Sequence, residues 1–263
     1  MELAKLIPSS AEELHHQLAL LMVVSGAATF LTLMFGPTAP YGRYTRGGWG
    51  PLINSNIAWM TQEIPSLLVA AAMCYRSGLV TYMDNPTSLR TVLTALFLSH
   101  YFYRSLVYPF LIKGRNRMPL SIWLMSVVYC AWNGYLQGFF LAHQLAPNSK
   151  ISPLGAVGIA IQIVGWFNVM QADRILTSLR KPGETGYKIP QGGPFRLVSA
   201  GNYASEILEW CGYALAARAL PAAAFAFFAF CNLAPRAWRH HKWYLSKFED
   251  YPKARKAVIP FVW

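Results

Sequence analysis

The chain of 263 residues is 54% hydrophobic and only 13% charged, and its formal net charge is +12. Soluble domains carry about 25% charged residues, so the composition excludes an ordinary water-soluble domain and predicts an integral membrane protein. The charge does not indicate nucleic-acid binding, because the basic residues lie in short loops between apolar segments.

The first residues, MELAKLIPSSAEELHHQ, lack the basic region, apolar run and small-residue cleavage site of a signal peptide, so we expect a mature N-terminus. A helix needs about 20 apolar residues to cross a bilayer. The candidate spans are residues 17–35, 53–75, 88–112, 120–143, 153–176, 203–220 and 221–234. We therefore expect an all-α membrane protein of seven transmembrane helices, folded as a single domain over residues 1–263.

The last two candidate spans meet at the Leu220–Pro221 step. Their summed length fits a tight hairpin better than one bent helix. The seventh span is short, and we expect it to continue as a helical C-terminal tail beyond the membrane. Most of the 23 lysines and arginines then fall in the first, third and fifth loops and in the tail. This asymmetry predicts a cytoplasmic C-terminus and an N-terminus on the outer or lumenal side.

The fifth loop contains LRKPGETGYKIPQGGPF, residues 179–195, and extends over residues 177–202. A connection of this length without its own secondary structure is usually functional or disordered. Its glycines and prolines suit tight turns. We expect a folded loop on the cytoplasmic side that closes over a ligand.

Ionisable side chains inside apolar spans are rare and indicate function. Glu63 lies near the middle of the second span, in TQEIPS, and Pro65 can bend the helix beside it. A carboxyl at this depth is expected to be neutral and able to donate a hydrogen bond. The alternative is a carboxylate that only pairs with a neighbouring helix.

The third span contains HYFYRSLVYPFLIKGR. Its Tyr101, Arg104, Tyr108 and Arg115 are spaced three, four and seven residues apart, so an α-helix would place them on one stripe. Snorkelling to the interface explains Arg115 but not Arg104, which is deeper. The stripe therefore predicts a ligand-facing surface that runs from mid-membrane to the basic side.

The later spans add polar residues near the same side. Asn168, Asp173 and Arg180 approach the cytoplasmic side at and just after the end of the fifth span, and the last two share a helix face. Asp173 could pair with Arg104 or Arg174, or bind ribose hydroxyls. Glu206 and Glu209 begin the sixth span, three residues apart, and are expected to face the same way.

The seventh span leads into a basic segment in which Arg236, His240 and Tyr244 are four residues apart and share one face. The alternative for this segment is an amphipathic surface on anionic lipid. Together with Tyr187 and Asn202, these side chains predict a cytoplasmic mouth that suits a polyanion with planar rings, such as a dinucleotide phosphate.

Several common sites have no motif in the sequence. It contains no GxGxxG and no GxxxxGK[ST], so a bound nucleotide would need a different cradle. It contains no CxxC and no HExxH, and the four scattered cysteines are expected to be apolar filling residues; we expect no metal.

Several longer motifs are specific to one family. The chain closely resembles the steroid 5α-reductases, 3-oxo-5-alpha-steroid 4-dehydrogenases, over almost all of its length in LRKPGETGYKIPQGGPF, GNYASEILEWCGYALA, WYLSKFEDYPKARKAVIPF, QEIPS and HYFYRSLVYPFL. The resemblance implies an NADPH-dependent enzyme that reduces the Δ4 double bond of a 3-oxo-steroid, with hydride added at C5 and a proton at C4. It also makes the fifth loop the lid and wall of the cofactor chamber.

The resemblance also implies roles for individual residues. Glu63 and Tyr101 match the family's catalytic residues, which hydrogen-bond the 3-keto oxygen as enolate charge develops. The cofactor-binding residues implied by motif match are Arg104, Arg115, Asp173, Arg180, Tyr187, Asn202, Glu206, Arg236, His240 and Tyr244. Tyr108, from the predicted stripe, and Asn168, beside the family's asparagine position, are added as candidates.

Two positions depart from the family pattern. The family's asparagine lies four residues before the aspartate of the fifth span, where this chain has Val169; Asn168 would point about 100° away. Ile112 replaces a residue that is polar in some members, which removes one possible cofactor hydrogen bond.

Other readings of the sequence remain open. A related membrane reductase could act on another lipophilic enone or enoyl substrate, such as an enoyl-thioester or a polyprenyl chain. A membrane methyltransferase or a transporter are more distant alternatives, and a transporter is disfavoured by the missing internal repeat. We expect a steroid substrate and membrane lipid as partners, no nucleic acid and no obligate protein partner, in a bacterial inner membrane or the endoplasmic reticulum.

Overall fold

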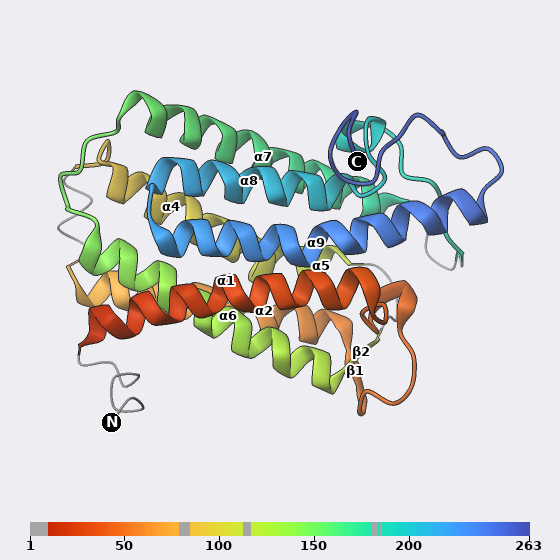
Figure 1. Ribbon diagram of the computed structural model, residues 1–263, viewed down its shortest axis with the longest axis horizontal. Helices are drawn as coiled ribbons and strands as arrows, with labels where there is room; N and C mark the ends of the chain where they lie inside the picture. Colours follow the sequence, from red (N-terminus) through yellow and green to blue (C-terminus); the bar gives the residue numbers. More distant parts are fainter. Residues whose placement is uncertain (1–9, 79–84, 113–116, 180–183, 185) are drawn as a thin grey trace.

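The computed structural model describes residues 10–78, 85–112, 117–179, 184 and 186–263, and over these residues the protein is mostly helical. The long helices lie side by side along one axis, as Figure 1 shows. They are α1 (Ala11–Phe35), α2 (Ser55–Arg76), α4 (Leu89–Phe102), α6 (Leu120–Phe139), α7 (Pro153–Ser178), α8 (Gly201–Ala217) and α9 (Leu220–Lys247).

Each candidate span of the sequence coincides with one of these helices. Among the described residues, α1, α2, α7 and α9 are long and apolar enough to cross a membrane. As an α-helix, α4 has 14 residues and α8 has 17, which is short for a span. A membrane protein is therefore confirmed in its coarse form, while seven spans stay a prediction. The first helix begins earlier than expected because Ser10 caps it, accepting a hydrogen bond from the Glu13 N–H at 3.1 Å.

The third span is not one regular α-helix. A π-helical turn, η3 (Tyr103–Val107), separates α4 from α5 (Tyr108–Leu111). Pro109 has no N–H to donate and its ring would clash with the preceding turn of an α-helix, so the wider π turn accommodates it. The stripe predicted at 100° per residue is therefore locally rewound at Arg104. A second π-helical turn, η4 (Phe140–Gln144), ends α6.

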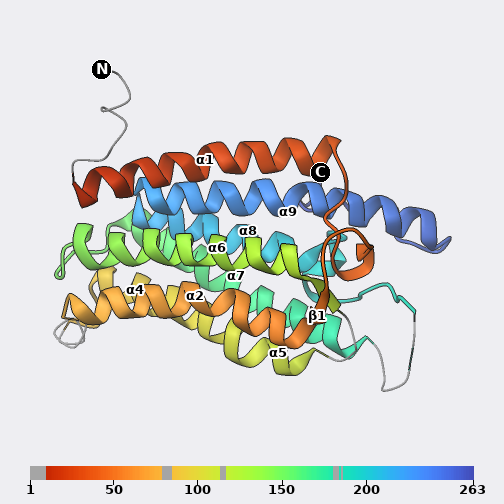
Figure 2. The same cartoon turned by 90° about the horizontal axis from the view of Figure 1, so that it is seen from below.

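The expected hairpin between the last two spans is confirmed. The chain reverses at Arg218, whose φ of 51° is left-handed, and Pro221 lies in the first turn of α9. The following helix continues without a break to Lys247, beyond the end of the bundle in Figure 2. The remaining residues 248–263 form turns and fold back, so the tail is helical only as far as Lys247.

The helices pack mainly as pairs: α7 on α8, α2 on α6, and α1 on α9 (Figure 2). Glycines allow the closest approach. A Cβ added to Gly158 would lie 2.5 Å from the Ala216 nitrogen, and one added to Gly212 would overlap the Gln162 nitrogen. Small residues let helix backbones come together where lipid gives no hydrophobic drive for association. The paired helices enclose a core that includes Phe97, Trp210 and Phe225.

One short sheet departs from the all-α expectation. Strand β1 (Leu52–Asn54) pairs antiparallel with β2 (Arg117–Pro119) and joins the first loop to the third. Three residues are too few for a strand to be recognised from alternation in the sequence. The sheet lies at the end of the bundle that also holds the C-terminus (Figure 2).

The described part of the fifth loop is folded, as predicted. It contains a 3-10 turn, η5 (Gly193–Arg196), and Val198 forms a parallel bridge with Lys256 of the tail. The Arg255 guanidinium donates to the Pro190 carbonyl at 3.0 Å and to Gln191 Oε1 at 2.6 Å. The returning C-terminal segment therefore holds this loop against the bundle.

Candidate functional site

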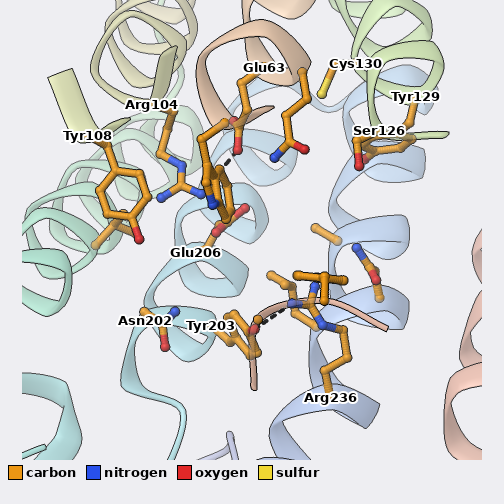
Figure 3. A pocket seen from close by; sticks show the side chains of 18 of the residues that line it. Glu63, Arg104, Tyr108, Ser126, Tyr129, Cys130, Asn202, Tyr203, Glu206 and Arg236 are labelled. Carbon is orange, nitrogen blue, oxygen red and sulfur yellow. Dashed lines mark hydrogen bonds and ion pairs between the residues drawn. The ribbon is translucent and has the colours of Figure 1, made fainter. Parts of the chain in front are cut away.

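A cavity of about 340 Å³ lies inside the bundle, near the end where the first loop and the sheet meet. Its volume is within the range of small-molecule pockets. The predicted site residues that line it are Glu63, Tyr101, Arg104, Tyr108, Asp173, Asn202, Glu206 and Arg236. Residues separated by long stretches of sequence are thus brought around one space (Figure 3).

Arg104 links two acidic side chains at this cavity. Its Nη2 donates to Glu63 Oε1 at 3.2 Å and its Nη1 to Asp173 Oδ2 at 3.4 Å. The guanidinium carbon lies 4.8 Å from the Trp59 ring and 4.6 Å from the Tyr108 ring. A buried guanidinium held by two acidic side chains and two aromatic faces is fixed in direction.

Tyr101 lies deeper, with 4% of its surface exposed. Its hydroxyl oxygen accepts a hydrogen bond from Asn133 Nδ2 at 2.9 Å. Its ring packs between Phe97, at 4.8 Å, and Trp210, at 6.1 Å between centroids. Aromatic packing on both sides fixes the ring, so the hydroxyl has a defined position beside the cavity.

The start of α8 supplies the opposite wall. Asn202, Tyr203 and Glu206 lie within one turn and face the cavity (Figure 3). The Arg236 Nη2 donates to Tyr203 Oη at 2.6 Å, and its guanidinium lies over the Tyr41 ring at 4.4 Å. This wall presents amide, hydroxyl, carboxyl and guanidinium groups, which together suit a ligand with hydroxyls and anionic oxygens.

Further predicted residues, from the fifth loop and the tail, gather in a second cluster around Arg43 of the first loop. The Arg43 guanidinium lies 5.0 Å from the Tyr187 ring and 4.9 Å from the Tyr244 ring, and Nη2 donates to Tyr244 Oη at 3.2 Å. His240 connects this cluster to the cavity wall through Tyr203, with Nε2 3.5 Å from Tyr203 Oη. Tyr187, His240 and Tyr244 are therefore adjacent to the lining but outside it.

Tyr44 also belongs to this Arg43 cluster, because its ring lies 5.4 Å from the His240 ring. Three buried polar atoms of the cluster have no hydrogen-bond partner among the described residues: Arg43 Nη1, Tyr44 Oη and His240 Nδ1. Burial raises the pKa of the Tyr44 hydroxyl, which keeps it a donor. Unmatched buried donors are unfavourable, and an anion would match them. The cluster therefore fits a phosphate-bearing cofactor.

The structure corrects the place of Asn168. Val169 lines the cavity, whereas Asn168 borders a separate surface hollow with Gln171 and Arg174. The helix is regular here, so one residue of offset turns the side chain about 100° away. Asn168 is not a residue of this cavity. Ile112 does line it and presents an apolar side chain there.

Glu206 and Glu209 do not share a role. Glu206 lines the cavity, but Glu209 is 1% exposed and points to α4, where its Oε1 lies 2.8 Å from His100 Nδ1. Residues three apart on a helix lie about 60° from each other around its axis, which here is enough to send one carboxyl to the ligand space and the other to a helix interface.

Arg115 and Arg180 lie outside the described residues. The described residues between α7 and α8 do not line the cavity, and Tyr41 and Gly42 of the first loop do. The first loop thus covers part of the cavity, a role that we expected for the fifth loop. The fifth loop contributes Tyr187 to the Arg43 cluster.

Several lining residues were missed from the sequence, among them Tyr41, Trp59, Gln62 and Tyr203. Gln62 is 5% exposed, and its Oε1 has no partner within the described part of the chain. The signal was available for Gln62, because a buried amide in an apolar span is costly in the same way as Glu63. Tyr41 has no such signal, since it lies in a loop.

Comparison with known proteins decides the family. A sequence model described as 3-oxo-5-alpha-steroid 4-dehydrogenase matches residues 116–263. The chain is 46% identical over 226 residues to 3-oxo-5-alpha-steroid 4-dehydrogenase 1 of Bos taurus, covering 85% of this chain and 88% of the relative. The chain belongs to the 3-oxo-5-alpha-steroid 4-dehydrogenase family. The family resemblance found in the sequence is confirmed.

The similarity to this family extends to both of its numbered types. Identity is 42% over 253 residues to 3-oxo-5-alpha-steroid 4-dehydrogenase 1 of Homo sapiens, covering 95% of this chain and 96% of the relative. Identity is 41% over 249 residues to 3-oxo-5-alpha-steroid 4-dehydrogenase 2 of Homo sapiens, covering 91% of this chain and 96% of the relative. The chain is therefore an oxidoreductase of the 3-oxo-5-alpha-steroid 4-dehydrogenase family, and its apolar helices make it a membrane protein.

Proposed function

We propose that this protein reduces the Δ4 double bond of 3-oxo-Δ4-steroids to 5α-dihydro products, using NADPH. The observation that carries the proposal is the convergence of Tyr101, Glu63 and the Arg104 guanidinium on one enclosed cavity in a chain of this family. The unit of function is one reductase domain over residues 1–263.

The substrate end of the cavity is formed by Tyr101 and Glu63. A Δ4-3-ketone becomes electrophilic at C5 when its carbonyl oxygen accepts hydrogen bonds, because the developing enolate charge is then stabilised. Tyr101 donates its hydroxyl hydrogen to this oxygen, and Glu63 donates as a neutral carboxyl. The apolar surroundings, with Phe225 and Phe228 in the lining, exclude water and suit a steroid skeleton.

The cofactor end is formed by Arg104, Asp173 and the polar wall of α8. Asp173 and Asn202 suit ribose hydroxyls and amide groups, and Arg236 suits a diphosphate. The hydride added at C5 is the chemistry that bound NADPH supplies, while C4 takes up a proton. The residues themselves hold the ring system beside the substrate and keep solvent out.

The Arg43 cluster supports NADPH rather than NADH. Arg43 Nη1, Tyr44 Oη and His240 Nδ1 are donors, or can be donors, that lack acceptors in the described structure. A 2′-phosphate supplies three acceptor oxygens and about two negative charges, whereas a 2′-hydroxyl supplies one neutral oxygen. We therefore assign the additional phosphate of NADPH to the Arg43 cluster.

For the membrane arrangement we propose seven spans, with the loops of the cavity end and the C-terminus in the cytoplasm. The first, third and fifth loops and the tail gather at one end of the bundle (Figure 2), and these segments carry most of the basic residues. A cytoplasmic mouth gives the site access to the cytoplasmic NADPH pool.

The proposal is tested with detergent-purified protein, NADPH, and testosterone or progesterone as substrate. We expect NADPH oxidation with formation of a 5α-dihydro steroid, identified by mass and by comparison with authentic 5α and 5β isomers. The matched control replaces NADPH with NADH at the same concentration. Cofactor binding without steroid product, but with reduction of another lipophilic enone, would contradict the steroid assignment.

A further inference from the structure

A chain of buried hydrogen bonds runs from Tyr101 away from the cavity. Asn133 Nδ2 contacts Tyr101 Oη at 2.9 Å, and Gln137 Nε2 contacts Asn133 Oδ1 at 3.2 Å. Gln137 Nε2 also contacts the Pro221 carbonyl oxygen at 3.0 Å, and Tyr213 Oη contacts Gln137 Oε1 at 3.2 Å. Asn133 and Gln137 are both 0% exposed. This chain of hydrogen bonds connects α4, α6, α8 and α9 behind the reactive tyrosine.

The direction of every bond in this chain follows from its far end. A backbone carbonyl can only accept, so the Pro221 oxygen must face the NH₂ group of Gln137. The amide orientation of Gln137 is then fixed, and its Oε1 is left to accept from Tyr213. The second hydrogen of the same NH₂ group goes to Asn133 Oδ1, which leaves the NH₂ group of Asn133 facing Tyr101.

Tyr101 Oη therefore accepts from Asn133, and its single hydrogen must go to another acceptor. The Ser66 hydroxyl is a neighbour of Tyr101. Its own hydrogen is donated to the Cys130 carbonyl at 2.8 Å, so towards Tyr101 it can only accept. The Ser66 oxygen is therefore an acceptor for the Tyr101 hydrogen outside the cavity. A carbonyl oxygen that enters the cavity competes with Ser66 for this hydrogen, and Tyr101 meets it only as a donor, because Asn133 already occupies the acceptor side of the hydroxyl.

We propose that Asn133 is a positioning residue, which acts through Tyr101 by occupying the acceptor side of the hydroxyl, so that Tyr101 meets the substrate carbonyl as a hydrogen-bond donor. Accepting one hydrogen bond also makes a hydroxyl a stronger donor in its second bond, since neighbouring bonds in a chain polarise one another. The inference rests on the proposed function, because the acceptor it serves is the steroid 3-ketone. Its consequence is that turnover depends on an amide that does not itself touch substrate.

The chain also explains why two amides occupy the middle of an apolar helix. Buried amides are unfavourable unless their groups are matched, and leucine would fill the same interface at lower desolvation cost. The next long helix along the chain, α7, carries Gln162, 1% exposed, whose amide atoms have no partner among the residues described. Gln162 is thus a buried amide that takes no part in this chain of hydrogen bonds, and it supplies a matched control.

The first test compares Asn133→Leu with Gln162→Leu, both of which replace a buried helical amide by an apolar side chain. Removing an oxyanion donor outright lowers kcat by about 10² to 10³, so misdirecting the Tyr101 hydrogen should lower it by about tenfold or somewhat more. We expect Asn133→Leu to show this loss with testosterone and NADPH at nearly constant KM, and Gln162→Leu to retain turnover within about twofold. A similar loss in both variants would contradict the proposal.

The second test repeats Asn133→Leu in a Tyr101→Phe background. If Asn133 acts through the Tyr101 hydroxyl, it has nothing left to position, and the double variant should turn over no more slowly than Tyr101→Phe alone. An equal further loss in the double variant would show a general structural role and overturn the inference. Inactive wild-type protein would instead be a failure of the proposed function.

A readout independent of turnover uses testosterone labelled with ¹³C at C3, bound in the presence of oxidised cofactor. A hydrogen bond lowers the infrared stretching frequency of the labelled carbonyl. We expect the frequency to rise in Asn133→Leu relative to the wild type and to stay in place in Gln162→Leu. An unchanged frequency in Asn133→Leu with bound steroid would show that the Tyr101 hydrogen does not depend on Asn133.

Discussion

The polar groups behind Tyr101 and those around Arg43 are organised differently. Behind Tyr101, the amides of Asn133 and Gln137 are both engaged in one directed chain that ends on a backbone carbonyl. Around Arg43, buried donors of three residues remain without protein acceptors in the described structure. In the first arrangement the amide groups are matched by other groups of the protein, and they orient the Tyr101 hydroxyl. In the second, the unmatched donors suit a ligand that supplies acceptor oxygens. Substitutions in the two regions should therefore affect turnover and cofactor affinity differently.

The largest effect is expected for Glu63→Gln, at the substrate end. The amide keeps the size of the side chain, and its oxygen can still accept from Arg104, but it cannot act as an acid. We expect turnover to fall by about 10² or more, as for loss of an oxyanion donor. Affinity for NADPH, measured by equilibrium titration, should change little. Equal losses in turnover and cofactor affinity would place Glu63 at the cofactor end instead.

A smaller effect is expected for Arg43→Met, which keeps the aliphatic stem over the aromatic rings and removes the guanidinium. A hydrogen bond to a charged group is worth about 1.5–3 kcal/mol, so the Kd for NADPH should rise by about 10- to 100-fold. NADH affinity should change much less. The control is Arg46→Met on the same loop, whose guanidinium lies over Trp49 at 6.0 Å. Parallel weakening of both cofactors would disprove the 2′-phosphate assignment.

Gly212→Val tests the frame that both regions share. The new side chain would overlap the Gln162 backbone, where α7 and α8 approach closely. Overpacking typically destabilises by about 1–3 kcal/mol, and we expect a thermal unfolding midpoint several degrees lower, followed in detergent by intrinsic fluorescence. Cys211→Val, on the exposed side of the same helix, is the control and should be nearly neutral. An unchanged midpoint in Gly212→Val would mean that the helices separate easily.

The smallest effect is expected for Asn168→Ala, because Asn168 lies outside the cavity. Its NADPH affinity should stay within about twofold of the wild type, since no charge-assisted contact is lost. Asn202→Ala removes an amide from the cavity wall and should weaken binding by about tenfold, if one hydrogen bond of about 1 kcal/mol or more is lost. Weakening in Asn168→Ala of the same size as in Asn202→Ala would restore Asn168 to the site.

The helices themselves could be predicted because their signal is local. Long apolar runs interrupted by glycine, proline and charge mark every long helix, and the turn at Arg218 follows from a proline step and a length argument. The π-helical turn at Tyr103–Val107 and the three-residue strands could not be predicted. Both depend on what packs beside them, and their own segments carry too few residues to show a period.

The same division holds for the site. Tyr101 and Arg236 could be predicted from their spacing on one face of a helix. Glu63 and Arg104 could be predicted because a charge in an apolar span is costly and visible in the sequence. Asn133 and Gln137 carried the same signal, but their partners, Tyr101 and the Pro221 carbonyl, come from other helices. No spacing along the chain reveals such a contact.

A helical membrane protein of the 3-oxo-5-alpha-steroid 4-dehydrogenase family could be recognised from the chain alone, since hydropathy, motifs and residue types are properties of the sequence. Which side chains meet depends on the packed structure. It turned Asn168 outward, sent Glu209 to His100, brought Tyr41 to the cavity and joined Asn133 to Tyr101. The physical reason is that packing between distant segments sets the rotation of each helix and the approach of its neighbours. A shift of one residue along a helix can move a side chain from the cavity to the outside of the bundle.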